Sequence, residues 1–329
     1  MTNRYKMKSN KRKNLLKRII YFGLAVLIFI NIIAAIQAYS YSHFRENVKP
    51  ITKEDDLSAW DITRMLFTGV EIARPTSNRI PGRDYKIISI PADDNKILDA
   101  WLLKTDSISN GIVILFHGYM AERSSMLEYG YNILDMGYDI MLVDFMGAGN
   151  SYGNQSTIGA LEAENVKAAV SYTINTLNEK KIYLMGFSMG AAAIIKSQSE
   201  YNLPVRAIIA EASYGKMLDT IDIRAKMFGL GILSKPASYN FLFWLGCING
   251  FNAYKMNPED YVKNIHIPLL IACGGKDQYI PQSETKRIYD NAASKQKFLK
   301  LYPDCAHELY LEKYPDQWRQ NISSFLDSH

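Results

Sequence analysis

Residues 181–195 read KIYLMGFSMGAAAII, and this stretch decides the fold. An apolar run of strand length meets the pentapeptide GFSMG, and an alanine-rich helical segment follows directly. A turn from strand to helix this tight requires small residues on either side of its apex, which Gly186 and Gly190 provide. The pattern predicts that Ser188 is held out above the sheet, at a helix N-terminus that favours developing negative charge.

The sequence on both sides of this stretch alternates between apolar runs and helical segments. Continuous Ile/Leu/Val runs are typical of parallel strands covered on both faces, and an alternating hairpin precedes them. We expect strands at 85–90, 97–104, 111–117, 138–145, 181–187, 205–212, 267–275 and 297–302. We expect helices at 122–136, 158–177, 189–200, 282–293 and 314–327. This order predicts an α/β domain with a mostly parallel sheet.

A serine becomes a strong nucleophile only when a base takes its proton and an acid orients that base. For a serine on such a turn, the acid and then the histidine follow along the chain. Of the five histidines, only His307 follows the last expected strand in a loop, YPDCAHEL. Asp277 follows the preceding strand, in GGKDQYIP, and is the predicted acid; Glu211 is the alternative.

Acyl transfer also needs donors for the oxyanion. The backbone N–H of Met189, directly after the nucleophile, is one predicted donor. The second should come from the loop after the strand at 111–117, where Tyr119 follows His117 and Gly118. The alternative is that this His-Gly pair is a plain turn.

Other site motifs are incomplete. Gly147 and Gly149 follow a strand, but Tyr152 occupies the third glycine position of a dinucleotide fingerprint. No phosphate-binding loop, zinc-helix motif or calcium loop occurs. We therefore expect no cofactor and no metal. The cysteines lack zinc spacing and allow at most one disulfide; they are Cys247, Cys273 and Cys305.

Composition describes a globular chain with a distinct N-terminus. Of 329 residues, 48% are hydrophobic and 22% charged, which excludes disorder over most of the length. The net charge is +5, but residues 1–18 carry eight Lys or Arg and no acid, so the remainder carries −3. A nucleic-acid-binding surface is therefore not expected.

Residues 19–39 predict a transmembrane helix. The 21 residues IIYFGLAVLIFINIIAAIQAY contain no charge, and only Asn31 and Gln37 are clearly polar. As a helix they span about 31 Å, which matches a hydrocarbon core of about 30 Å. The basic tail 1–18 predicts a cytoplasmic N-terminus and a signal anchor, with the domain on the other side, periplasmic or extracellular in a bacterium. A signal peptide cleaved near Ala38 or Ser40, giving a secreted form, is the alternative.

Residues 40–82 are interpreted as a juxtamembrane connector. Apolar residues recur at helical spacing from Asp56 to Val70. This segment is either a short helix packed on the domain or a helix at the membrane surface or the mouth of the site. Two prolines and a glycine in ARPTSNRIPGRDY then break regular structure.

The strings FHGY, DFMGAGNS, GFSMG, GGKDQYIP and CAHEL occur in the order and spacing of one large family. From about Tyr85 to the C-terminus, the chain resembles the α/β-hydrolase superfamily. The resemblance is to the branch of membrane-anchored bacterial esterases, monoacylglycerol-lipase-like and serine-aminopeptidase-like hydrolases. It implies a hydrolase domain at 83–329, an eight-stranded sheet with helices on both faces, and a helical cap at about 213–260. Met146 departs from the family, where Arg is frequent.

The resemblance and the residues together predict a serine hydrolase that cleaves carboxylic esters, with a small-molecule or lipid-like substrate. The cap segment is rich in apolar residues that suit an acyl pocket or plain packing, namely Met217, Met227, Phe228, Phe241, Phe243, Trp244 and Tyr254. The predicted pocket residues are Phe187, Phe241 and Trp244.

Two other functions stay open at this point. A peptidase or amidase acting on small peptides would need polar groups for the substrate terminus, with Glu211, Asp219 and Asp222 as candidates. A noncatalytic binding protein built on the same fold is the other alternative, although such a protein does not require a complete Ser, Asp and His set. The sequence leaves the oligomeric state open.

Overall fold

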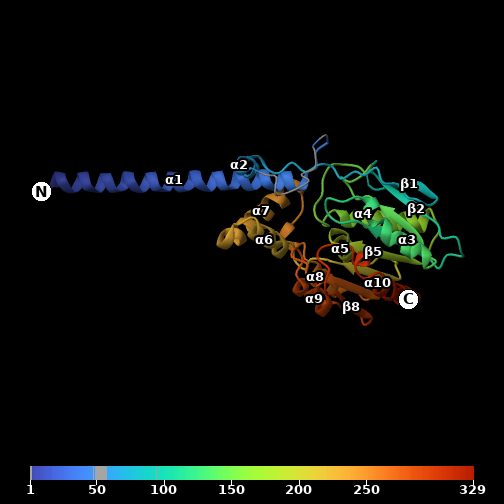
Figure 1. The fold of residues 1–329 in the computed structure, drawn as a ribbon. Helices are drawn as coiled ribbons and strands as arrows, with labels where there is room; N and C mark the ends of the chain where they lie inside the picture. The colour runs from blue at the N-terminus through green and yellow to red at the C-terminus, as the bar shows by residue number, and fades with distance from the viewer. Residues whose placement is uncertain (1, 47, 49–57, 94) are drawn as a thin grey trace.

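The computed structural model describes residues 2–46, 48, 58–93 and 95–329. A long N-terminal helix projects from a rounded α/β domain, and the C-terminus lies on the far side of that domain (Figure 1).

Eight strands form one sheet in the order β1-β2-β4-β3-β5-β6-β7-β8. Their bounds are β1 (Tyr85–Pro91), β2 (Ile97–Leu103), β3 (Ile112–Phe116), β4 (Asp139–Val143), β5 (Ile182–Phe187), β6 (Ala207–Glu211), β7 (Leu269–Gly274) and β8 (Lys297–Tyr302). The pairs β1–β2 and β2–β4 are antiparallel, and all the other pairs are parallel. The predicted mostly parallel eight-stranded sheet is confirmed.

The central strands β4, β3, β5 and β6 are buried at every position, which shows that the sheet is covered on both faces. All five residues of β3 are buried. Ile112 and Ile114 join one hydrophobic core, whereas Val113 and Leu115 join the other, as the two-residue period of a strand requires. The core that contains Ile112 also holds apolar residues of α4 (Glu162–Asn175), α5 (Met189–Tyr201) and α9 (Gln282–Asn291).

The second core lies beneath α3 (Leu127–Asp135) and α10 (Pro315–Asp327), which contribute Tyr129 and Trp318. The expected helix at 122–136 begins as a 3₁₀ turn at Arg123–Met126 before α3. The other expected helices begin and end within about four residues of their expected bounds.

The segment between β6 and β7 forms a helical cap. It contains α6 (Met217–Met227), α7 (Ser234–Asn249) and the short α8 (Pro258–Tyr261). Leu242 and Leu245 of α7 are fully buried in the core of the α5 side of the sheet. The cap is therefore packed onto the domain.

The N-terminal helix α1 (Thr2–Ser42) is longer than the predicted 19–39. In the described part of the chain it is the one helix that is long and apolar enough to cross a membrane, from Arg12 to Ser42, by length and composition. The last turns of α1 differ from the earlier ones because they pack on other elements. Ala38 is fully buried, and α1 contacts both α7 and α2 (Ala59–Thr68).

The connector is attached to the domain in its described parts. His43 forms an isolated antiparallel β-bridge with Gln155, and Arg45 forms a parallel one with Ala73. The Arg74 guanidinium donates to the carbonyl oxygens of Gly149 (2.9 Å), Ser151 and Gly153. Within the expected helix at 56–70, α2 covers Ala59–Thr68, while residues 56 and 57 lie outside the described residues.

Candidate active site

Ser188 sits on the turn between β5 and α5 in an unusual backbone conformation, with φ +54° and ψ −114°. Its N–H donates to the Glu211 carbonyl oxygen at 2.8 Å. Positions 186 and 190 require glycine because neighbouring backbone approaches them closely. A Cβ on Gly186 would lie 2.5 Å from the Gly190 carbonyl carbon, and one on Gly190 would lie 2.3 Å from the Phe116 oxygen.

Two side chains from later loops meet the serine. The Ser188 hydroxyl lies 3.0 Å from His307 Nε2, and His307 Nδ1 lies 2.7 Å from Asp277 Oδ2. Ser188 follows β5, Asp277 follows β7 and His307 follows β8, so the three meet where parallel strands of one sheet have their carboxyl ends. The remaining Asp277 oxygen accepts the N–H groups of Tyr279 and Ile280, both at 2.9 Å.

Glu211 takes no part in this cluster. Its buried carboxylate accepts from the Tyr129 hydroxyl and, at 2.9 Å, from Trp318 Nε1, both in the core under α3 and α10. Burial raises its pKa to about 7 despite these two hydrogen bonds. The alternative acid therefore lies on the opposite face of the sheet from the cap, and Asp277 is the carboxylate at His307.

The loop after β3 lies against the serine. A Cβ on Gly118 would be 3.6 Å from the Ser188 Cβ. Among the described residues, neither the Met189 N–H nor the Tyr119 N–H donates a hydrogen bond to a backbone carbonyl. Met189 begins α5, where N–H groups lack helical partners.

His117 fixes the backbone of this loop. Its ring bridges Gly118 and Phe145: Nδ1–H donates to the Gly118 oxygen at 2.8 Å, and Nε2 accepts the Phe145 N–H at 3.1 Å. Complete burial lowers the pKa of His117 to about 4, so the ring is neutral at pH 7. Sequence reasoning assigned no role to this side chain, because its partner lies 28 residues away on another loop.

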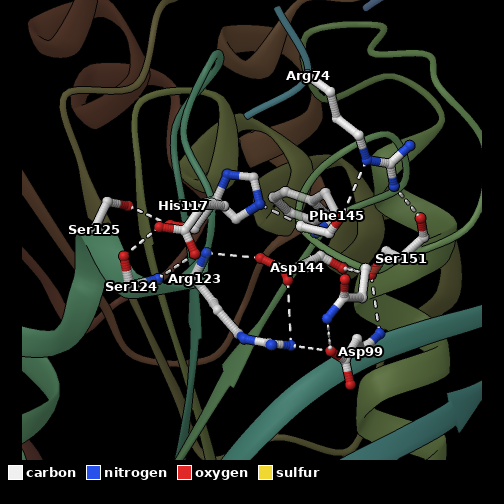
Figure 2. A network of polar contacts seen from close by, with 12 residues as sticks. Arg74, Asp99, His117, Arg123, Ser124, Ser125, Asp144, Phe145 and Ser151 are labelled. Carbon is white, nitrogen blue, oxygen red and sulfur yellow. Dashed lines mark hydrogen bonds and ion pairs between the residues drawn. The ribbon is translucent and has the colours of Figure 1, made fainter. Parts of the chain in front are cut away.

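Figure 2 shows the polar network that continues from His117. Asp144, fully buried, accepts the Arg123 N–H at 2.7 Å and lies 3.2 Å from the Arg123 guanidinium. The same guanidinium lies 2.6 Å from Asp99 and covers the Trp101 ring at 4.2 Å. Burial raises the pKa of Asp144 to about 7, opposed by Arg123. This network joins β2, the loop directly after β4 and the 3₁₀ turn before α3.

The predicted pocket residues have different surroundings. Phe187 lies in the site, with its ring centroid 5.1 Å from that of His307. Phe241 contacts Tyr41 of α1, edge to face at 5.5 Å. Trp244 donates through Nε1 to the Asn31 oxygen of α1 at 3.1 Å. Phe241 and Trp244 therefore face the N-terminal helix, which the sequence did not indicate.

The remaining acidic cap candidates are already partnered. Asp219 lies 2.8 Å from the Arg287 guanidinium. Asp222 accepts from the Ser234 hydroxyl and lies beside Lys226, each at 2.7 Å. The three cysteines are free.

The sheet order, the cap after β6 and the turn at Ser188 define an α/β hydrolase. Comparison with known proteins identifies the family within this class. The family described as "Serine aminopeptidase, S33" matches residues 107–237 and 248–314, so this chain belongs to that family of serine hydrolases.

The chain is similar to an uncharacterized protein, YqkD, of Bacillus subtilis, with 24% identity over 66% of this chain and 71% of that protein. It is 20% identical to a monoacylglycerol lipase of Mycolicibacterium smegmatis, over 71% of this chain and 93% of the lipase. The solved structure of the Pyrococcus furiosus esterase Pf2001 covers 78% of this chain and 97% of the esterase, with a TM-score of 0.64 and 24% identity. The similarity to the esterase structure shows that the two proteins share a fold.

Proposed function

We propose that this protein cleaves carboxylic esters through a Ser188–His307–Asp277 triad and an acyl-enzyme. The observation that carries the proposal is the pair of short contacts on His307, 3.0 Å to the Ser188 hydroxyl and 2.7 Å to Asp277. Such an arrangement can take the serine proton on one side of the ring and hold the other side in the donor tautomer.

In the proposed first step, the Ser188 hydroxyl oxygen attacks the ester carbonyl carbon and its proton passes to His307 Nε2. Asp277 accepts from His307 Nδ1–H and stabilises the imidazolium that forms. The imidazolium then protonates the departing alcohol, which leaves the acyl group on Ser188. Water, deprotonated by His307, attacks the acyl carbon, and the returning proton restores the serine as the acid leaves.

The oxyanion would be held by the N–H groups of Met189 and Tyr119. Among the described residues neither N–H donates to a backbone carbonyl, and this and the closeness of Gly118 to Ser188 support the role. Losing one such donor typically costs about 2.7–4 kcal/mol of barrier. Because the donors are backbone groups, substitution of the Tyr119 side chain should have a smaller effect.

We further propose that the substrate is lipid-like and that α1 anchors the enzyme in a membrane, with the N-terminus cytoplasmic and the domain on the other side. The similarity to a monoacylglycerol lipase supports the substrate class. The apolar composition of α1 and the basic residues before it support the anchor and its orientation. Peptidase action is less supported, because Glu211, Asp219 and Asp222 are occupied by protein partners.

The test compares two substrate classes on the full chain in detergent. p-Nitrophenyl esters of increasing acyl length are measured beside aminoacyl p-nitroanilides. We expect ester turnover that exceeds anilide turnover and falls by at least about 10³-fold in Ser188→Ala. Ser199→Ala, on the same helix α5, is the control and should match the parent. Faster anilide turnover would establish the peptidase instead, and equal ester rates in Ser188→Ala and the parent would exclude the triad.

A further inference from the structure

We propose that the turn joining α6 and α7 inserts into the lipid leaflet beside α1, on the side of the membrane that holds the domain. We call this turn, residues 227–233, the cap tip. The proposal depends on the proposed membrane anchor but not on the proposed ester hydrolysis.

The depth of α1 in a bilayer follows from its own charges. Lys17 and Arg18 are exposed and mark the point where the hydrocarbon core begins, because a charged side chain inside the core is costly. A core of about 30 Å holds about 20 helical residues, so it extends to about residue 38. Tilting the helix would place more of its residues in the core. Asn31 lies 13 residues beyond Arg18, about 20 Å along the axis and well inside the core.

Parts of the domain are bonded to α1 at this depth. The Asn31 oxygen accepts from Trp244 Nε1 of α7 at 3.1 Å. Gln37 Nε2 donates to the carbonyl oxygens of Met65 and Leu66, both at 2.8 Å, at the end of α2. The two polar side chains of the apolar segment are thus satisfied by the cap and the connector. If α1 crosses the membrane, the part of α7 that bonds Asn31 enters the membrane with it.

The cap tip has the surface that such a position requires. Residues 227–233 read MFGLGIL, and all seven are exposed. Phe228 is 77% exposed, Ile232 95% and Leu233 64%. Consecutive exposed apolar residues of this kind mark an interaction site on a soluble surface.

The cap tip also points in the required direction. Figure 1 shows α6 and α7 beside the C-terminal part of α1, with their joining turn directed toward the N-terminal end of that helix. Lys226 and Lys235 flank the apolar run, and both are exposed. Lys226 is paired with Asp222 at 2.7 Å, and the long stem of a lysine can cover apolar surface while its ammonium group reaches toward a polar environment. A lipid leaflet is the partner that fits an apolar run bordered by cations and held beside a membrane helix.

The candidate site is close to the C-terminal end of α1. The Tyr41 ring, near the end of α1, stacks on Tyr119 with centroids 4.9 Å apart, and the Tyr119 hydroxyl donates to the Tyr41 oxygen. Tyr119 belongs to the loop beside Ser188. The loop that carries the predicted oxyanion donor Tyr119 is therefore in direct contact with the C-terminal end of α1.

The test places an environment-sensitive fluorophore at single introduced cysteines in the full chain, in a Cys247→Ser background. Cys273 and Cys305 are buried and should not react. The variants are Ile232→Cys in the cap tip, Val26→Cys in α1 and Ile108→Cys as the matched control. Ile108 is 94% exposed, like Ile232, but lies between β2 and β3 on the domain. Each protein is reconstituted into phosphatidylcholine–phosphatidylglycerol vesicles that contain lipids with a spin label at a shallow or a deep acyl position.

We expect blue-shifted emission and loss of fluorescence to the lipid quenchers at positions 26 and 232, with neither at 108. Both positions should be quenched by the deep label, because the cap tip extends from the level of Asn31 toward the N-terminal end of α1. Quenching at 26 with a water-like spectrum at 232 would overturn the cap-tip proposal and leave the anchor standing. A water-like spectrum at 26 would overturn the anchor and the cap-tip proposal together. Neither result would affect the ester assay, which is done in detergent.

Discussion

Ser188 adopts a backbone conformation that a non-glycine residue rarely takes, and such a conformation costs about 1–3 kcal/mol. It is held by its N–H bond to the Glu211 oxygen and by the flanking glycines, which let β5, α5 and β3 approach closely. The strain is therefore maintained by neighbouring backbone, and it keeps the hydroxyl directed at His307.

Gly190→Ala should destabilise the protein strongly. Its Cβ would lie 2.3 Å from the Phe116 carbonyl oxygen, which is backbone and cannot move alone. The control is Gly153→Ala, at φ +73° with no atom within 4 Å of the new Cβ, which should cost about 1 kcal/mol from backbone strain. Thermal unfolding of both variants measures the difference. Equal melting temperatures would contradict the close-packing account.

Glu211→Gln should change how stability depends on pH. The folded-state pKa of Glu211 is raised to about 7, so its contribution is full below the unfolded value of about 4.5 and is lost as pH rises through about 7. The variant lacks this titration. Its free energy of unfolding, relative to that of the parent, should therefore be higher at pH 8 than at pH 5, by about 3 kcal/mol at most. The measurement is the melting temperature of variant and parent at both pH values. A difference that is independent of pH would show that Glu211 does not titrate in this range.

At the scale of elements, the sheet could be predicted because its signals are local. The apolar run 111–117 and its neighbours carry strand length, composition and turns within a few residues. The positions of Ser188, Asp277 and His307 follow from strand order, since parallel strands place their carboxyl ends together. The catalytic roles of these residues stay predictions.

Contacts between distant elements could not be predicted in this way. Trp244 and Asn31 are 213 residues apart, and their bond depends on the angle at which α7 meets α1. No residue pattern within either helix encodes that angle. For the same reason, the cap aromatics could be interpreted as a pocket, although Phe241 and Trp244 contact α1.

The loop after β3 depends on His117 for its position. In His117→Phe, the buried Phe145 N–H loses its acceptor and the Gly118 oxygen loses its donor. We expect kcat to fall by about tenfold or more, because the neighbouring N–H group is displaced from the oxyanion position. Steady-state kinetics with a p-nitrophenyl ester measure the effect.

Tyr119→Phe is the matched variant, since it keeps the backbone N–H and loses only the hydroxyl bond to the Tyr41 oxygen. It should retain most of the parent kcat. A larger loss in Tyr119→Phe than in His117→Phe would mean that the side chain, rather than the backbone position, controls the step.

At the scale of the whole molecule, the N-terminal helix is part of the folded domain. Ala38 belongs to the hydrophobic core that holds Phe116 and Met189, and Phe44 is 4% exposed. Cleavage near Ala38 or Ser40 would remove or release these contacts. Cleavage at this point should therefore lower the stability of the folded domain.

A chain that begins at residue 45 should therefore melt at a lower temperature than one that begins at residue 19, in the same detergent. The loss comes from the buried side chains of Ala38, Ser42 and Phe44. Residues 12–18 are exposed, so the chain from residue 19 should match the full chain. Circular dichroism at 222 nm follows the transition. Coincident melting curves for all three chains would show that α1 does not support the domain.

The central claim is that Ser188 is an activated nucleophile, and a fluorophosphonate probe tests it most directly. The probe reacts with a serine whose proton can be taken and needs little substrate specificity. We expect the full chain in detergent to be labelled at Ser188, identified by peptide mass, with no labelling in Ser188→Ala and strong loss in His307→Ala. Ser199→Ala should be labelled like the parent. A folded parent that is not labelled, or is labelled at another residue, would contradict the proposed triad.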